Sequence, residues 1–466
     1  MGISERAAKA GSDLQGAAGN TVQSCPKVTL EIGVFFDGTG NNTANTQSQG
    51  KSASYNNARS NVSLLFPLYK SGERFTVKNS CGGAARKFGS IYKEGIGTTA
   101  GESDYRPGNL TGAATGMGMT GVESRVFDAC LDVGRMINQL SPGVEPTEII
   151  LDVFGFSRGA AAARYFVNCM RQGYIDYLAY YVVPKRASLP KGRKIRIRYV
   201  GIFDTVAAIG NGKNDKNGDV NVHVATKQAD RIHHLTAKHE YRGNFRLNHS
   251  LPGGGAHRQM IGAHSDVGGG YRAAGDSALV EKTQVHSYYI KDHVDTAHAA
   301  AVREAAAVRS SASSFWASEG WIRPNEAPGE GLVNEPSAVR SRVPQGALGA
   351  GQPLYTFTTG ARLNRPWVKI GLSRIALRLM YDDAQSASVP FLSFPTSGEY
   401  EVPADLRQLA GSYASTGNMP GTPVAREILR NYGHMSSSYD LFESPGMTPN
   451  TGWRRGIAPN QPDKAK

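Results

Sequence analysis

The chain alternates between short apolar runs and longer segments whose apolar side chains recur at helical spacing. The runs are rich in β-branched and aromatic residues, as buried strands are. The strands predicted in this way are residues 27–36, 148–154 and 195–203. The predicted helices are residues 61–69, 122–139, 367–387 and the polar, alanine-rich stretch 283–311. These strands and helices are the framework on which the candidate chemistry below is placed.

The clearest chemical signal follows the apolar run at 148–154. Residues 155–159 read Gly-Phe-Ser-Arg-Gly, which fits Gly-x-Ser-x-Gly, and residues 160–170 favour a helix. A strand, a sharp turn and a helix form the nucleophile elbow of α/β-hydrolases, in which the two glycines let strand and helix approach. Such a turn presents Ser157 at the carboxyl edge of the sheet, with the helix N-terminus and the Arg158 N–H nearby to stabilise an oxyanion. The alternative is a glycine-rich turn that binds a phosphate or nothing.

A serine nucleophile needs an imidazole as base and a carboxylate that orients the imidazole. Asp204 ends the strand predicted at 195–203, and His264 lies in a flexible, glycine-bounded loop. Ser157, Asp204 and His264 follow the order of the α/β-hydrolase triad along the chain. For Asp204 the alternative interpretation is an ordinary helix N-cap after the strand.

His434 is the main rival for the base, because hydrolase histidines often come late in the chain. The cluster of His233, His234 and His239 has metal-like spacing in part, but no carboxylate pattern accompanies it. Triad chemistry needs no metal, so neither a metal site nor a cofactor is expected.

A second oxyanion donor is expected in the loop after the first strand. Residues 37–43 read Asp-Gly-Thr-Gly-Asn-Asn-Thr, which places backbone N–H groups at the edge of the sheet. Gly38 or Thr39 is our choice of donor. An ordinary tight turn explains the pattern about equally well.

The amino-acid composition narrows the classes of protein to which this chain can belong. The 466 residues are 40% hydrophobic and 20% charged, as in a soluble globular protein large enough for a sizeable core. A net charge of +13 favours an anionic partner, and since no nucleic-acid motif is found, a membrane surface or an acidic protein is preferred. Four scattered cysteines make no disulfide framework, and the N-terminus lacks the apolar segment of a secretory signal.

With these residues in view, the chain resembles the phospholipase effectors of the type VI secretion system whose elbow reads Gly-Phe-Ser-Arg-Gly-Ala. Four segments carry the likeness: residues 36–42, the elbow with its helix through Arg164, residues 201–206 and residues 262–271. A fifth segment, residues 374–381, is similar more loosely. Their joint order is far more specific than any single motif.

The resemblance implies an α/β-hydrolase fold with a mostly parallel central sheet, flanked by helices and carrying inserted loops. It implies a carboxylic ester hydrolase of the phospholipase A1 or A2 type, with Ser157 as nucleophile, Asp204 as acid and His264 as base. It implies an antibacterial effector whose substrate is a phospholipid membrane and whose partners are a type VI spike or tube component and a cognate immunity protein. It also implies secretion without a signal peptide and action in the periplasm of the target cell.

The domain organisation expected from these patterns has five parts: a flexible tail at 1–26, a hydrolase core at 27–311, an insertion at 312–365, the rest of the core at 366–445, and a tail at 446–466. The insertion would act as a lid or engage the membrane, with Phe315, Trp316 and Trp321 as interfacial aromatic residues. Two other functions stay open at this point. One is a soluble serine esterase or acyltransferase of the same fold, and the other is a non-catalytic basic interaction protein.

Overall fold

A computed structural model describes residues 28–50, 52–80, 82–178, 184–188, 195–210, 217, 220–271, 275–288, 294–323, 326, 329–342, 353–439 and 455–466. The predicted tail at 1–26 lies outside these residues, as do residues 446–454 of the second predicted tail.

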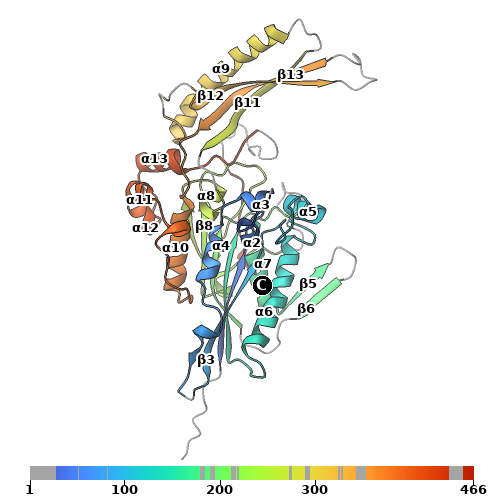
Figure 1. Cartoon of the computed structure of the whole chain (residues 1–466), viewed down its shortest axis with the longest axis vertical. Helices are drawn as coiled ribbons and strands as arrows, with labels where there is room; N and C mark the ends of the chain where they lie inside the picture. Colours follow the sequence, from blue (N-terminus) through green and yellow to red (C-terminus); the bar gives the residue numbers. More distant parts are fainter. Residues whose placement is uncertain are drawn as a thin grey trace, which may run out of the picture.

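The core is a seven-stranded sheet in the order β10-β8-β7-β4-β1-β3-β2 (Figure 1). All neighbouring strands are parallel except β2, which runs antiparallel to β3 at the edge. The strands are β1 (Thr29–Phe36), β2 (Val77–Lys78), β3 (Ala84–Lys93), β4 (Glu148–Phe156), β7 (Ile195–Phe203), β8 (Arg231–Ala237) and β10 (Ala256–Met260). The prediction of a mostly parallel sheet is confirmed, and so are the three strands expected from apolar runs.

Helices cover both faces of this sheet, which is why its central strands are apolar on both sides. One face carries α6 (Val122–Leu140) and α7 (Arg158–Gln172), and the other carries α4 (Asn61–Leu65) and α10 (Ser373–Ser386) (Figure 1). The predicted helices at 122–139 and 367–387 correspond to α6 and α10. The predicted helix at 61–69 is α4 continued by the short 3-10 turn η1 (Phe66–Leu68).

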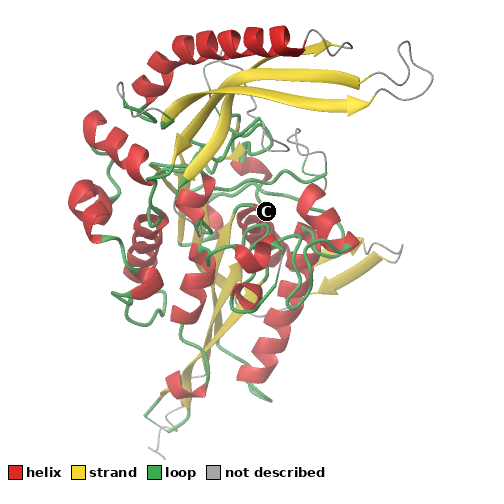
Figure 2. Ribbon diagram, turned by 45° about the horizontal axis from the view of Figure 1, so that its top comes forward, coloured by secondary structure: helices red, strands yellow, loops and turns green. Residues whose placement is uncertain are grey.

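A second sheet projects from one end of the core together with a long helix (Figure 2). It is antiparallel, in the order β11-β13-β12, and α9 packs on it. Its elements are β11 (Asp276–Tyr288), α9 (Val294–Glu319), β12 (Gly331–Arg342) and β13 (Pro353–Arg365). The prediction of one helix over 283–311 is therefore wrong in its first part, because residues 283–288 pair with β13 as a strand.

The two tryptophans expected at an interface are instead in the core. The side chains of Trp316 and Trp321 are fully buried. Trp316 Nε1 donates to Glu281 Oε1 at 3.0 Å, and the Arg365 guanidinium lies 4.7 Å from the Trp321 ring centroid. These contacts lie within the projecting unit, and Trp321 Nε1 also donates to the hydroxyl of Tyr241 in the core at 3.3 Å. The expectation of interfacial side chains is therefore wrong for both residues.

The other elements are mostly short and belong to the connections between these strands and helices. They are α2 (Thr43–Thr46), α3 (Ala53–Asn56), η2 (Glu73–Phe75), α5 (Pro107–Thr115), β5 (Tyr174–Leu178), β6 (Pro184–Ser188), η3 (Thr226–Gln228), β9 (Leu247–Asn248), α8 (His264–Gly268), η5 (Gly398–Tyr400), α11 (Ala404–Ala410), α12 (Ser412–Thr416), α13 (Thr422–Tyr432), β14 (Ile457–Ala458) and η8 (Pro462–Lys464).

The last described segment, residues 455–466, packs into the core. Its strand β14 pairs in parallel with β9. The Asn460 side chain is almost fully buried and donates to Val224 O and Pro252 O, both at 2.7 Å. These bonds hold the segment against the loops that follow β7 and β9.

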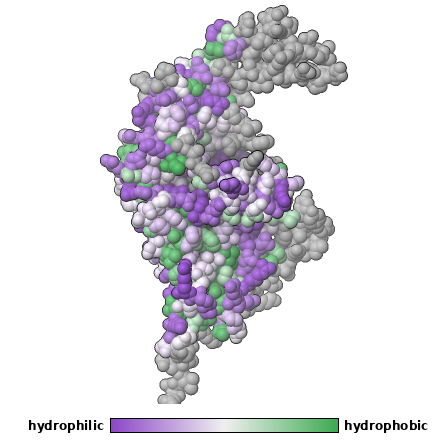
Figure 3. Space-filling view, in the orientation of Figure 1, coloured by the Kyte–Doolittle hydropathy of each residue, from purple (hydrophilic) through white to green (hydrophobic). Residues whose placement is uncertain are grey.

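The face shown in Figure 3 mixes hydrophilic and hydrophobic residues, and the hydrophobic ones form small groups rather than one continuous area. Among the described helices, none combines the length and the apolar character needed to cross a membrane.

Candidate active site

Ser157 occupies the turn between β4 and α7, with φ of 58° and ψ of −126°. A positive φ is strained for a residue with a side chain, and such strain is typical of functional turns. A Cβ on Gly155 would lie 2.5 Å from Gly159 O, and one on Gly159 would lie 2.3 Å from Asp37 O. Strand, helix and the loop after β1 therefore meet at Ser157 only because both flanking residues are glycine.

Asp204 and His264 form a buried pair, with His264 Nδ1 2.5 Å from Asp204 Oδ2. Asp204 comes directly after β7, and its Oδ1 accepts a hydrogen bond from the Ala237 N–H at 2.8 Å. His264 is the first residue of α8, so the expectation of a flexible loop is wrong at this position. Its N–H donates to Glu240 Oε2 at 3.2 Å. Hydrogen bonds to several elements therefore fix the positions of Asp204 and His264.

The same edge of the sheet brings Ser157 close to this pair. The His264 ring packs on Phe156, the residue before Ser157, at 4.6 Å between ring centroids, and on Phe245 at 4.9 Å. Phe245 in turn lines a cavity of about 40 Å³ with Ser157 and Arg158. Among the described residues, no hydrogen bond joins the Ser157 hydroxyl to His264. Bonds of this kind are often long in unliganded hydrolases and tighten when substrate binds.

A third residue, Arg455, completes the surroundings of Asp204. Its Nη1 lies 2.6 Å from Asp204 Oδ1 and its Nη2 lies 2.9 Å from Asp204 Oδ2, so the pair is bidentate. Sequence reasoning missed this residue and placed it in a C-terminal tail. Nothing in its local sequence could have revealed the contact, since the two residues are 251 positions apart.

These contacts determine the protonation states of Asp204 and His264. Burial alone would raise the pKa of Asp204, but Arg455 and His264 together hold that pKa far below its ordinary value. Burial lowers the pKa of His264, and the Asp204 carboxylate offsets only part of that shift. Asp204 is therefore ionised and His264 is neutral near pH 7, which are the states that a triad acid and base require.

The loop after β1 contacts the elbow where a second oxyanion donor was expected. The Gly38 N–H donates to Asp37 Oδ1 at 2.7 Å. Asp37 is buried and also accepts from Ser60 Oγ at 2.5 Å and from the Tyr92 hydroxyl at 2.6 Å. Burial raises the pKa of Asp37. The carboxyl group thus anchors the loop and engages the Gly38 N–H, while Thr39 Oγ1 is buried without a hydrogen-bond partner in the described part of the chain.

The side chain of Arg158 has a structural contact of its own. Its Nη1 donates to Ala113 O at 2.6 Å and to Gly112 O at 3.2 Å, near the end of α5. Burial lowers its pKa to about 10. The guanidinium thus fixes α5 beside the elbow, whereas the Arg158 N–H belongs to the first turn of α7, where N–H groups have no intrahelical acceptor.

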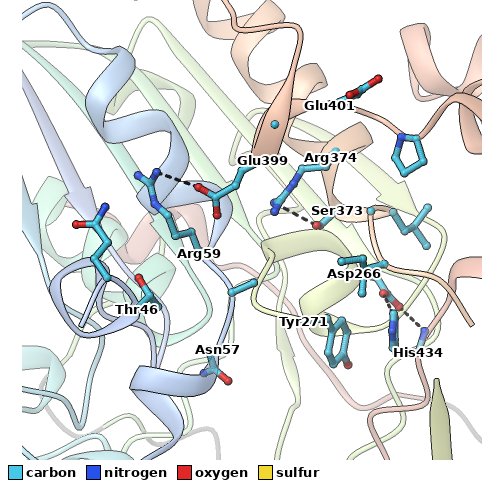
Figure 4. Close-up of a pocket in the computed structure, with 17 residues that line it drawn as sticks. Thr46, Asn57, Arg59, Asp266, Tyr271, Ser373, Arg374, Glu399, Glu401 and His434 are labelled. Atoms are coloured by element: carbon cyan, nitrogen blue, oxygen red, sulfur yellow. Dashed lines mark hydrogen bonds and ion pairs between the residues drawn. The ribbon is translucent and has the colours of Figure 1, made fainter. Parts of the chain in front are cut away.

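His434 lies elsewhere. Its Nδ1 is 2.8 Å from Asp266 Oδ1, and its ring stacks on Tyr271 at 4.1 Å between centroids. These residues line a separate cavity of about 690 Å³, which shares no lining residue with the cavity at Ser157 (Figure 4). The structure therefore places His264, and not His434, against the residue preceding Ser157.

No group of three or more histidine, cysteine or acidic side chains in the described residues has the arrangement of a metal site. His233 contacts Asp383, with 3.1 Å between Nδ1 and Oδ2, and His239 Nδ1 accepts from the Gly262 N–H at 3.0 Å. The histidine cluster with metal-like spacing is thus engaged in separate contacts.

Part of the chain matches a known protein family. Residues 181–289, which include Asp204 and His264, match the family model described as "T6SS, Phospholipase effector Tle1-like, catalytic domain". No curated protein sequence matches the chain.

Among solved structures, the fold is similar to that in "Structure of the Tle1 effector bound to the VgrG spike from the Type 6 secretion system". The TM-score is 0.64 at 23% identity, over 93% of this chain and 94% of that chain. An uncharacterized protein from Pseudomonas aeruginosa gives a TM-score of 0.41 at 18% identity, over 91% of this chain and 55% of that chain. Over residues 181–289 the chain is thus similar to the catalytic domain of Tle1-like phospholipase effectors of the type VI secretion system, and over nearly its whole length it shares the fold of a Tle1 effector.

Proposed function

We propose that this protein is a type VI secretion effector and a serine phospholipase A whose triad is Ser157, Asp204 and His264. Ser157 Oγ attacks the carbonyl carbon of an sn-1 or sn-2 ester while its proton passes to His264 Nε2. The tetrahedral intermediate collapses, and the same proton moves to the departing glyceryl oxygen, which releases a lysophospholipid and leaves an acyl-serine. Water, deprotonated by His264, then attacks the acyl-serine. His264 returns that proton to Ser157 Oγ as the fatty acid leaves, which restores the free serine.

The observation that carries this proposal is the buried pair of His264 Nδ1 and Asp204 Oδ2, 2.5 Å apart. The imidazole of His264 packs on Phe156, which directly precedes Ser157 in its strained turn. An imidazole held at Nδ1 by a carboxylate presents Nε2 as a base, which is the arrangement that activates a serine. Nucleophile, base and acid follow β4, β10 and β7, which end at one edge of the parallel sheet.

The charge that develops on the carbonyl oxygen needs donors that are already in place. We assign the Arg158 N–H at the N-terminus of α7 as one donor, aided by the positive end of the helix dipole. The second donor comes from the Gly38–Thr39 loop. Thr39 is the better choice of the two, because the Gly38 N–H is already engaged by Asp37.

The resemblance to the effector solved on a VgrG spike supports a spike component as the delivery partner of this chain. A type VI effector that attacks phospholipids would act in the periplasm of the target cell, and its producer would need an immunity protein. The net charge of +13 would concentrate the enzyme on anionic lipid.

The test is fatty-acid release from phospholipid vesicles by the purified protein, beside the variants Ser157→Ala and Ser141→Ala. Ser141 is a buried serine at the end of α6 whose hydroxyl donates to Ile137 O at 2.8 Å, so its variant controls for loss of a buried hydroxyl. We expect release by the wild type and by Ser141→Ala, and none above background by Ser157→Ala.

Release that survives in Ser157→Ala would refute the serine mechanism. Hydrolysis of short soluble esters without any release from vesicles would instead favour the soluble esterase. Analysis of the lysophospholipid product assigns the sn position.

A further inference from the structure

The cavity beside His434 is built from segments far apart in the chain, and its residues have no part in the proposed reaction (Figure 4). Its volume of about 690 Å³ lies in the range of small-molecule sites. The polar side chains that face it in Figure 4 include Arg59, Asp266, Arg374, Glu399 and His434. The charges of these side chains decide what the cavity can hold.

Each carboxylate that lines this cavity already has a cation of its own. Asp266 pairs with His434, and Arg59 Nη1 lies 3.4 Å from Glu399 Oε2. Glu401 at the rim lies 3.6 Å from Arg407 Nη2. These three pairs leave the charge of the remaining lining side chain unbalanced.

That side chain is Arg374, at the start of α10. Its hydrogen bonds are long and go to neutral groups: Nη1 donates to Asn61 Oδ1 at 3.2 Å and to Ser373 Oγ at 3.5 Å. Among the described residues no carboxylate lies within ion-pair distance of it. Burial lowers its pKa to about 10, so the guanidinium of this partly buried side chain stays charged at pH 7. The carboxylate whose charge acts on Arg374 is Glu399, which is already paired with Arg59. A partly buried cation that shares its carboxylate in this way favours a further anionic ligand.

A second group in the cavity lacks a partner. His434 Nε2 is buried and makes no hydrogen bond within the described structure. The other ring nitrogen is held by Asp266, which raises the pKa of His434 against the opposing effect of burial. When the imidazole is protonated, it presents an N–H donor at Nε2. Arg374 and His434 therefore offer two sets of donors and no matching acceptor.

We propose that this cavity binds the phosphodiester of a phospholipid head group, with Arg374 contacting the phosphate oxygens and His434 Nε2 as a second donor. A planar guanidinium matches two phosphate oxygens at once, which makes arginine well suited to this ligand. The choice of a lipid phosphate rests on the proposed function, since phosphodiesters are the anions that a phospholipase meets at its substrate surface. Asp266 and Tyr271 support the His434 ring.

The binding test uses the full-length protein and glycerophosphoglycerol, a soluble phosphodiester without an acyl ester, measured by isothermal titration calorimetry. We expect Arg374→Gln to weaken binding by about tenfold or more, the equivalent of one charge-assisted contact. His434→Gln should weaken it by a smaller factor. The matched control is Arg378→Gln, one turn further along α10, where the side chain is about half exposed and pairs with Asp382.

Equal affinity in the wild type and Arg374→Gln, or no binding by the wild type, would overturn the proposal. Inorganic phosphate bound as tightly as glycerophosphoglycerol would overturn the assignment to a lipid head group. Arg374→Lys keeps the charge and is the second variant if Arg374→Gln unfolds, with intermediate affinity expected. Because glycerophosphoglycerol is not an acyl ester, its binding does not depend on whether Ser157 hydrolyses lipid. A failure of the head-group site and a failure of the proposed phospholipase activity can therefore be told apart.

Discussion

Arg455 and Asp204 face each other in a bidentate ion pair, 2.6 Å and 2.9 Å long, inside the candidate active site. The carboxylate that orients the imidazole of His264 is therefore shared with a guanidinium from the last segment of the chain. Because that segment is itself anchored through Asn460, Arg455 is held in place and not merely near Asp204. Arg455 is thus a positioning residue of the proposed triad, since it acts through Asp204.

We predict that Arg455→Gln lowers kcat by about tenfold or more, since a buried carboxylate loses its main partner. Loss of the cation also makes the surroundings of His264 more negative, so the pKa of His264 rises. In the wild type burial lowers that pKa, and kcat/KM should rise with pH through a value below the ordinary pKa of histidine. In Arg455→Gln the acid limb of the pH profile of kcat/KM should move to higher pH.

The measurement is the pH dependence of kcat/KM for both proteins, with Arg455→Lys as the variant that keeps the charge. Lysine should restore the position of the acid limb better than it restores kcat, because it cannot make the bidentate contact. An acid limb at the same pH in the wild type and in Arg455→Gln would show that Arg455 has only a structural role.

The second prediction separates the two histidines considered as base. We expect His264→Ala to lower kcat by about a thousandfold, the usual effect of losing a general base. His434→Ala should stay within about tenfold of the wild type, because its partner is Asp266 and its cavity is separate. Fatty-acid release from vesicles measures both variants. The reverse ranking would make His434 the base.

The third prediction concerns the steric requirement of the elbow. Gly159→Ala should destabilise the fold by about 1–3 kcal/mol and abolish activity, because its Cβ would meet Asp37 O and Phe36 O. The control is Gly134→Ala in the middle of α6, where a Cβ has open space. That change should stabilise the protein by up to about 1 kcal/mol. Urea unfolding measures both, and a fully stable Gly159→Ala variant would contradict the packing.

The fourth prediction concerns the buried charges below the site. Arg198 Nη1 lies 2.9 Å from Glu31 Oε2, and its Nη2 lies 2.5 Å from Asp152 Oδ2. Both carboxylates are fully buried. Arg198→Met should therefore cost about 3–5 kcal/mol of unfolding free energy, because two buried charges lose their shared cation.

The matched control for Arg198 lies two residues earlier on β7. Arg196 pairs with Asp230 at the surface, where both side chains are nearly half exposed. Exposed pairs contribute little, so Arg196→Met should cost no more than about 1 kcal/mol. Equal losses in the two variants, measured by urea unfolding, would show that burial does not control the strength of these pairs.

The local geometry of the site was predictable because it depends on neighbours in the chain. The order of strand, serine and helix around Ser157 follows from an apolar run, two glycines and a helix-forming segment, and all three are visible in the sequence. The pairing of Asp204 with His264 was also predictable, since residues that follow parallel strands meet at one edge of the sheet. Their catalytic roles stay a proposal until the variants are measured.

Other features were decided by tertiary contacts alone. Residues 283–288 are polar enough for a helix, yet they form a strand because β13 offers them backbone partners. Trp316 and Trp321 lie in a segment whose composition is typical of an interface, but the projecting sheet and Arg365 bury both side chains. The contact of Arg455 with Asp204 joins positions 251 residues apart. No local pattern records such a contact, because it exists only when the sheet, its loops and the last segment are packed together.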